Sequence, residues 1–167
     1  MYHELTENDI KKMEEEIEYR RVVVRKEKLE AVKEARAHGD LSENFEYYAA
    51  KRDKNKNESR IRYLEREIRT AKIIEDTAGI DEVGLFNTVT LYYEDEDEED
   101  TVKIVTSLRV DATVGKVSNV SPIGKAIMGH RVGDRVYVEL GKDNGYYVVI
   151  KKIEKTVDDG SDELREF

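Results

Sequence analysis

The chain has 167 residues, 40% charged and 38% hydrophobic, and its 38 acidic and 29 basic residues give a net charge of -9. The absence of cysteine excludes disulfides, thiolate zinc sites and cysteine nucleophiles, and it favours the cytosol. No run approaches the roughly 18 apolar residues of a membrane span, and the first ten residues carry no basic, apolar leader. We therefore expect a cytoplasmic protein with no membrane partner.

The first 76 residues are predicted to be helical, because they contain one glycine, Gly39, and no proline. Apolar residues recur at heptad-like spacing on both sides of that glycine. They are Ile10, Met13, Ile17, Val24 and Ala31 before it, and Tyr47, Ala50, Ile61, Leu64, Ile68 and Ala71 after it. This pattern predicts an antiparallel coiled-coil hairpin over residues 1–76 with its tip at residues 37–44. Arg20, Lys54 and Asn57 on the seam predict weaker packing toward the tip.

The second half is predicted to be a small α+β domain over residues 84–155, joined to the hairpin by a linker at 77–83. Four β-branched and aromatic runs, at 88–93, 101–105, 135–140 and 146–150, predict an antiparallel sheet. Ser121 as N-cap, Pro122 at the first position and Gly129 at the end predict a short helix. Seven consecutive acidic residues at 94–100 indicate a hairpin loop, and residues 156–167 an acidic, disordered tail.

Two carboxylates, Asp40 and Glu43, stand three residues apart at the start of the second predicted helix. This spacing is typical of a capping box, which is the simpler interpretation. The alternative is that the tip presents both carboxylates to a divalent cation. Mg²⁺ prefers oxygen ligands but keeps much of its water, so two carboxylates would need further ligands from a partner.

The sequence HGDLSEN-x-EYYAAK at residues 38–51 resembles a motif of the Gre transcript-cleavage factors of bacterial RNA polymerase, in particular the GreA type. A second block, from Ser121-Pro122-Ile123-Gly124 to Gly133-Asp134, resembles the C-terminal signature of the same family. The resemblance extends over roughly residues 5–153. It implies a coiled coil that enters the polymerase secondary channel and an FK506-binding-protein-like domain that docks at the channel rim through Ser121, Pro122, Ile123 and Gly124.

The resemblance also implies a role for the tip carboxylates. Asp40 and Glu43 are expected to share a Mg²⁺ ion with the polymerase active site and to orient water for cleavage of backtracked RNA. Two-metal hydrolysis of this kind uses one ion to activate water and another to stabilise the leaving oxygen. We therefore expect a monomeric accessory factor that is not itself an enzyme and binds no cofactor alone. Its expected partners are RNA polymerase and the 3′ end of nascent RNA.

A basic patch near the tip is the second feature that the resemblance implies. Its residues are Arg36, Lys51, Arg52, Lys54 and Lys56. Lys and Arg beside phosphates would contribute sequence-independent, salt-sensitive affinity for RNA. The alternative is an ordinary charged helix surface, because Asp53 and Glu58 lie among these residues.

Two other functions fit the same scaffold. One is a channel-occupying polymerase inhibitor that does not stimulate cleavage, and the other is an unrelated coiled-coil adaptor with a capped tip. Phe45 also departs from the Gre pattern, because it stands where the family usually has a small residue.

Overall fold

The computed structural model describes residues 2–38 and 44–166 of the chain. They form two compact units, one of residues 8–71 together with residues 2 and 3, and one of residues 4–7 and 72–166. Within the described residues, no helix combines the length and the apolar composition needed to cross a membrane.

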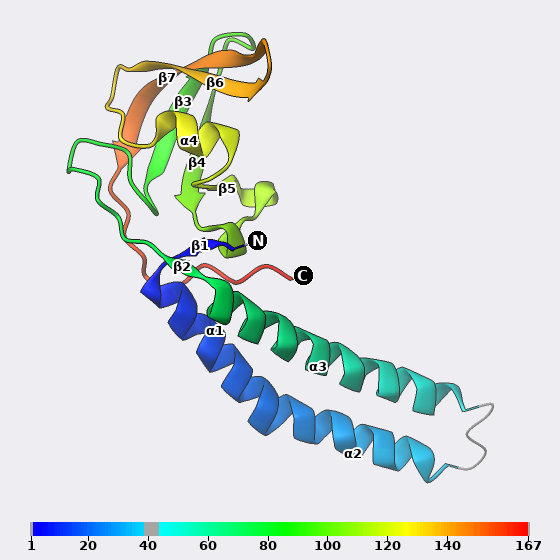
Figure 1. Ribbon diagram of the computed structural model, residues 1–167. Coiled ribbons are helices and arrows are strands. Elements are labelled where there is room, and N and C mark those ends of the chain that lie inside the picture. The colour runs from blue at the N-terminus through cyan, green and yellow to red at the C-terminus, as the bar shows by residue number, and fades with distance from the viewer. Residues whose placement is uncertain (1, 39–43, 167) are drawn as a thin grey trace. The chain divides into compact units, whose positions relative to one another are not determined.

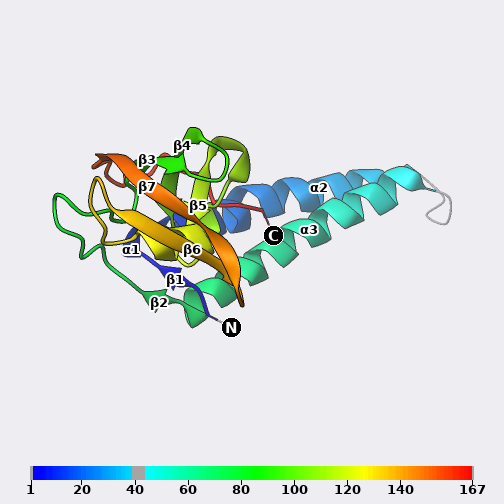
Figure 2. The same cartoon turned by 90° about the horizontal axis from the view of Figure 1, so that it is seen from above.

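The first unit is a hairpin of two long helical runs that lie side by side (Figure 1 and Figure 2). The first run consists of α1 (Glu7–Tyr19), a π-helical segment η1 (Arg20–Val24) and α2 (Arg25–Arg36). The second run is α3 (Phe45–Thr70). The predicted antiparallel helical hairpin is therefore confirmed.

The seam between the helices is apolar at the end away from the tip. Met13 and Ile17 of α1 are buried there, as are Ile61 and Leu64 of α3. Burial of one such side chain is worth about 1.5–3 kcal/mol. This end therefore supplies most of the hydrophobic stabilisation of the hairpin.

Closer to the tip, the seam is built from charged and amide side chains. Glu16 accepts hydrogen bonds from Arg20 Nε at 2.8 Å and from Arg60 Nε at 2.9 Å. Arg20 Nη1 donates to Asn57 Oδ1 at 3.0 Å. Burial opposes ionisation of Glu16, but the hydrogen bonds from Arg60 and Arg20 outweigh it and lower its pKa below the ordinary 4.5. The predicted polar seam is confirmed at Arg20 and Asn57, and the charge of Arg20 is paired with Glu16.

The π-helical segment η1 changes the register of the first helical run. The Arg25 N–H donates to the carbonyl of Arg20, five residues earlier. Asn57 Nδ2 donates to the same carbonyl at 3.4 Å. The extra residue in this turn rotates the positions that follow it. Ala31, predicted on the seam, is therefore exposed, whereas Ala35 is buried.

The second unit contains a five-stranded sheet in the order β5-β4-β3-β7-β6. Its strands are β3 (Thr88–Tyr93), β4 (Glu98–Val105), β5 (Lys116–Ser118), β6 (Arg135–Gly141) and β7 (Asn144–Glu154). The pairs β3–β4, β3–β7 and β6–β7 are antiparallel, but β4 and β5 are parallel. The sheet is therefore mixed, and the prediction of a wholly antiparallel sheet is wrong. The sequence did not reveal the parallel strand β5, because three residues are too few to show a strand pattern. A separate parallel pair joins β1 (Glu4–Leu5) to β2 (Lys72–Ile73).

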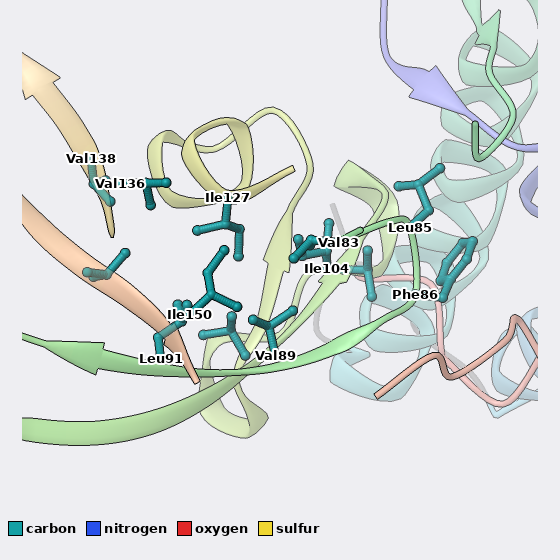
Figure 3. Close-up of a cluster of buried hydrophobic side chains, with 13 residues drawn as sticks. Val83, Leu85, Phe86, Val89, Leu91, Ile104, Ile127, Val136, Val138 and Ile150 are labelled. Atoms are coloured by element: carbon teal, nitrogen blue, oxygen red, sulfur yellow. The ribbon is translucent and has the colours of Figure 1, made fainter. Parts of the chain in front are cut away.

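The predicted short helix is confirmed as α4 (Pro122–Ile127), and it covers one side of the core. The Ser121 hydroxyl accepts a hydrogen bond from the Gly124 N–H at 3.1 Å and caps the helix. Ile127 lies among residues of the core cluster that includes Val89, Leu91 and Ile150 (Figure 3). Two short 3-10 helices, η2 (Ser107–Arg109) and η3 (Ala112–Val114), connect β4 to β5.

The segment predicted as a linker, residues 77–83, belongs to the second unit. Lys155 Nζ donates to the carbonyls of Gly79 at 3.0 Å and Glu82 at 2.8 Å. The Val83 N–H donates to the His130 carbonyl at 2.8 Å. The acidic loop predicted at 94–100 is also shorter than expected, because β4 begins at Glu98.

The C-terminal segment, predicted as a disordered tail, makes defined contacts in its described part. Asp158 accepts two hydrogen bonds from the buried guanidinium of Arg109, at 2.7 and 2.8 Å. Asp162 is buried and pairs with Lys116 at 2.8 Å and with Lys103 at 3.1 Å. Acidic composition suggested a solvated tail, but it could not reveal that a buried arginine 49 residues earlier needs a counter-charge.

We expect Glu16→Gln to lower the free energy of unfolding of the hairpin at pH 7 by about 2 kcal/mol. The reason is that Arg60 then stays buried without its full counter-charge. Folding lowers the pKa of Glu16, so the ionised carboxylate stabilises the folded state at pH values above its ordinary pKa of 4.5. This stabilisation is lost as the pH falls through the pKa that Glu16 has in the folded state.

The difference in unfolding free energy between the variant and the wild type should therefore be constant near neutral pH and should shrink as the pH falls below 4.5. Urea unfolding followed by far-UV circular dichroism measures it, with the exposed Glu15→Gln as the matched control. Destabilisation that stays the same in neutral and in acidic solution would show that the ion pair is not its cause.

Candidate functional site

The tip of the hairpin lies between the end of α2 at Arg36 and the start of α3 at Phe45. Asp40 and Glu43, the two carboxylates predicted to act at the tip, lie outside the described residues. Their role as ligands of a shared Mg²⁺ ion therefore stays a prediction. The described residues on either side give the geometry of the two helix ends.

Asn44 links these two helix ends. Its Oδ1 accepts a hydrogen bond from the Tyr47 N–H at 3.0 Å and caps α3. Its Nδ2 donates to the Ala35 carbonyl at 2.7 Å, in the last turn of α2. One side chain thus satisfies a terminal donor of one helix and a terminal acceptor of the other. The capping-box interpretation of Asp40 and Glu43 is wrong for α3, because its N-cap is Asn44.

Three of the five predicted basic residues gather around Tyr47. The Arg36 guanidinium lies 5.6 Å from the centroid of the Tyr47 ring. A hydrogen bond with Arg36 lowers the pKa of the Tyr47 phenol, and the positive charges of Lys51 and Lys54 add to this effect. The structure therefore brings Arg36, Lys51 and Lys54 together from both sides of the tip. This group is called the Tyr47 cluster below.

The other two predicted basic residues, Arg52 and Lys56, lie on a different part of α3. Both are exposed, whereas Lys54 is half-buried. At about 100° per residue, Arg52 and Lys56 point roughly 160° away from Lys54. The predicted patch is therefore divided between two faces of the helix. Sequence proximity alone could not distinguish one patch from two.

The four predicted docking residues differ in what they can offer to a partner. Pro122 is exposed, whereas Ser121 caps α4 and Ile123 packs against the core. Gly124 is buried, and a Cβ there would lie 2.1 Å from the Ser118 carbonyl oxygen. Gly124 therefore allows α4 to pack closely, and Pro122 is the only one of these four residues that is exposed.

A groove of about 620 Å³ adjoins Pro122. Val120 lines it from the loop before α4, and Tyr137 and Leu140 line it from β6. These three side chains are 41%, 44% and 53% exposed. Reasoning from the sequence missed Tyr137 and Leu140, because an edge strand with exposed apolar residues has the same alternating pattern as any other strand.

Comparisons with known proteins point to one family. A family model described as "Transcription elongation factor, N-terminal" matches residues 3–73, and one described as "Transcription elongation factor, GreA/GreB, C-term" matches residues 77–155. Transcription elongation factor GreA of Bacillus licheniformis is 48% identical over 136 residues, which are 81% of this chain and 86% of that protein. GreA of Streptococcus pneumoniae is 45% identical over 153 residues, which are 91% of this chain and 95% of that protein.

Solved structures of related sequence are also found. One is Gfh1 of Thermus aquaticus, which is 28% identical. The alignment covers 91% of this chain and 97% of that chain, with a TM-score of 0.42.

We expect Asn44→Ala to destabilise the first turn of α3 by about 1 kcal/mol, because the Tyr47 N–H loses its cap. Asn44→Asp keeps a capping oxygen but loses the Nδ2 donor to Ala35, so the two variants separate the two hydrogen bonds. Amide hydrogen exchange at Tyr47 is the measurement. Exchange should accelerate in the alanine variant and stay nearly unchanged in the aspartate variant. Equal acceleration in both would assign the effect to the contact with Ala35.

Proposed function

Because this chain belongs to the GreA/GreB family of transcription elongation factors, we propose that it acts by stimulating RNA polymerase to cleave backtracked RNA. The hairpin enters the secondary channel of the polymerase, and the second unit docks at the channel rim. The factor works as a monomer in the cytoplasm and has no active site of its own. The observation that carries the proposal is the match of both family models, in order, over residues 3–73 and 77–155.

The chemical contribution of the chain is a pair of carboxylates, Asp40 and Glu43, delivered to the polymerase active site. Their hard oxygen donors suit Mg²⁺, and two such donors are too few for a tight site without ligands from the polymerase. The ion would supply Lewis-acid activation of water for phosphodiester hydrolysis. The task of this chain is then to hold both carboxylates at the end of a narrow helical hairpin and to orient the attacking water.

The geometry around the tip supports this role in two ways. The N-cap of α3 is Asn44, so Asp40 is not the residue that caps this helix. The Tyr47 cluster places Arg36, Lys51 and Lys54 beside the tip, where phosphates of the nascent RNA would be met. Such contacts contribute salt-sensitive affinity without sequence preference.

Asp40→Asn and Glu43→Gln should each reduce RNA cleavage in stalled elongation complexes by roughly tenfold or more, because an amide is a poorer Mg²⁺ ligand than a carboxylate. The measurement is the rate of transcript shortening on a gel, with the factor at saturation. Glu46→Gln is the matched control, because Glu46 is an exposed carboxylate of the first turn of α3.

Polymerase affinity and folding should be the same in all three variants. Cleavage that is unchanged in both tip variants would eliminate the metal-binding role. If the wild-type factor slowed RNA synthesis and left the 3′ end intact, it would instead be a channel-occupying inhibitor.

We expect Leu140→Glu to weaken polymerase docking, because it places a charge in the groove beside Pro122. The concentration of factor for half-maximal cleavage should rise about tenfold, with the maximal rate unchanged, since the groove contributes only to binding. Val114→Glu is the control, because Val114 is 63% exposed and does not line the groove. Equal effects of the two variants would show that this groove is not the docking surface.

A further inference from the structure

The C-terminal segment, residues 156–166 in its described part, is attached to the second unit at both ends. The Thr156 hydroxyl donates a hydrogen bond to the Phe86 carbonyl. Near the other end, the Arg165 N–H donates to the Leu108 carbonyl at 2.7 Å. The segment follows the residues that the family models match, which end at 155, so membership of the family does not account for it. It is called the C-terminal strap below.

Between these two points, the strap is held by cations from three elements of the sheet domain. Asp158 accepts hydrogen bonds from both terminal nitrogens of Arg109 in η2, at 2.7 and 2.8 Å. Asp162 lies 3.1 Å from Lys103 of β4, 2.8 Å from Lys116 of β5 and 3.6 Å from Arg109. Lys103, Arg109 and Lys116 are called the cationic seat below. Two carboxylates of one acidic peptide thus meet three positive charges.

Burial makes the position of the strap depend on these ion pairs. The side chain of Arg109 is fully buried, and those of Asp158 and Asp162 are 10% and 3% exposed. Burial opposes ionisation of Asp162, but hydrogen bonds from Lys116 and Lys103 outweigh it and lower its pKa below the ordinary 3.8. Exposed ion pairs contribute little, whereas a buried cation that loses its counter-charge is strongly destabilised. The two aspartates therefore hold the strap in place.

The helix η2, which the strap holds through Arg109, lies against the short strand β1. Leu5 of β1 is completely buried. The hydroxyls of Ser107 in η2 and Ser118 in β5 are 3.2 Å apart and share a hydrogen bond. Asn119, which follows Ser118, donates from Nδ2 to the Glu4 carboxylate of β1 at 3.2 Å. The strap, η2, the end of β5 and β1 therefore form one continuous series of contacts within the second unit.

The strand β1 occupies a special place in the chain, because α1 begins at Glu7, two residues after it ends. Its partner β2 begins two residues after α3 ends at Thr70. The two strands pair in parallel, and the Ile74 N–H donates to the Leu5 carbonyl at 2.9 Å. The pairing of β1 with β2 thus joins the two connections that run from the hairpin into the second unit.

We propose that the cationic seat is a binding site for an acidic peptide, that the C-terminal strap is its ligand within the same chain, and that seating of the strap keeps β1 paired with β2. When Asp158 and Asp162 leave the seat, η2 loses its support and β1 separates from β2. This device goes beyond the proposed function, because it requires neither the tip carboxylates nor RNA polymerase.

Native-state hydrogen exchange of the full-length chain, followed by NMR in low concentrations of urea, tests whether the strap and β1 open together. The amides of Arg165 and Ile74 report on the strap and on the β1–β2 pair. The Ile150 amide, which donates to the Asp134 carbonyl at 3.0 Å in the core sheet, reports on global unfolding. We expect Arg165 and Ile74 to share one opening free energy that is lower than that of Ile150.

The double variant Asp158→Asn, Asp162→Asn should accelerate exchange of Arg165 and Ile74 by the same factor, at least about tenfold, because both open states lose the same ion pairs. Asp159→Asn is the matched control. It removes the same charge from the same strap, but Asp159 is exposed and accepts only from the nearby Ser161 N–H at 2.9 Å. Exchange of both reporter amides should stay at the wild-type rate in this control.

A second pair of variants isolates the buried charge and remains informative if the double variant does not fold. Asp158→Asn alone leaves Arg109 without its bidentate partner. Adding Arg109→Met should reverse most of the acceleration at Ile74, because no buried cation then lacks its counter-charge. Effects of the two substitutions that simply multiply would show that this ion pair does not hold the strap.

Two further results would overturn the proposal. One is an Ile74 amide that exchanges with Ile150 and not with Arg165 in the wild type. The other is faster exchange of Arg165 in the double variant with Ile74 unchanged, which would make the strap a local attachment without influence on β1. None of these measurements uses RNA cleavage, so the proposed function and this proposal can fail independently.

Discussion

The pairing of Glu16 with Arg60 inside the hairpin is the interaction on which the geometry of the tip depends. Arg60 is 6% exposed and its Nε donates to Glu16 at 2.9 Å, so Glu16 supplies a counter-charge to a buried cation. Arg20 and Asn57 complete the network from the two helices. These four side chains can form their hydrogen bonds only in one alignment of the two helices. We therefore infer that the network sets the register of α3 against the first helical run. A wholly apolar seam would tolerate sliding more easily.

The register determines what each face of the tip presents. With Asn57 opposite Arg20, the first turns of α3 place Tyr47 beside Arg36 and Asn44 beside Ala35. The helical period then directs the exposed side chains of Phe45, Tyr48, Arg52 and Lys56 away from the seam. Two faces of different chemistry thus arise from one short segment. One holds cations around a half-buried phenol, and the other exposes aromatic rings followed by cations.

Much of the fold could be predicted from local pattern. The first 76 residues contain a single glycine and no proline, and this pattern correctly predicted a helical hairpin. The β-branched and aromatic run at residues 88–93 coincides with β3. The predictions that failed depend on distant partners. Ala31 does not lie on the seam, because the first helical run contains a π-helical turn in which Asn57 hydrogen-bonds to the Arg20 carbonyl. The C-terminal segment makes defined contacts because Asp158 pairs with the buried Arg109. The parallel pairing of β5 likewise depends on contact with β4.

For the candidate site, the sequence by itself determined the motif at residues 38–51 and the family that this motif indicates. It also determined that two carboxylates and five basic residues lie near one turn. Only the tertiary structure decided that Asn44 caps α3, that the basic residues divide between two faces, and that Tyr137 and Leu140 join Pro122 at a groove. The physical reason is that spacing along a chain specifies a direction around one helix or strand. Which groups meet depends on the register between elements, and buried pairs far apart in sequence set that register.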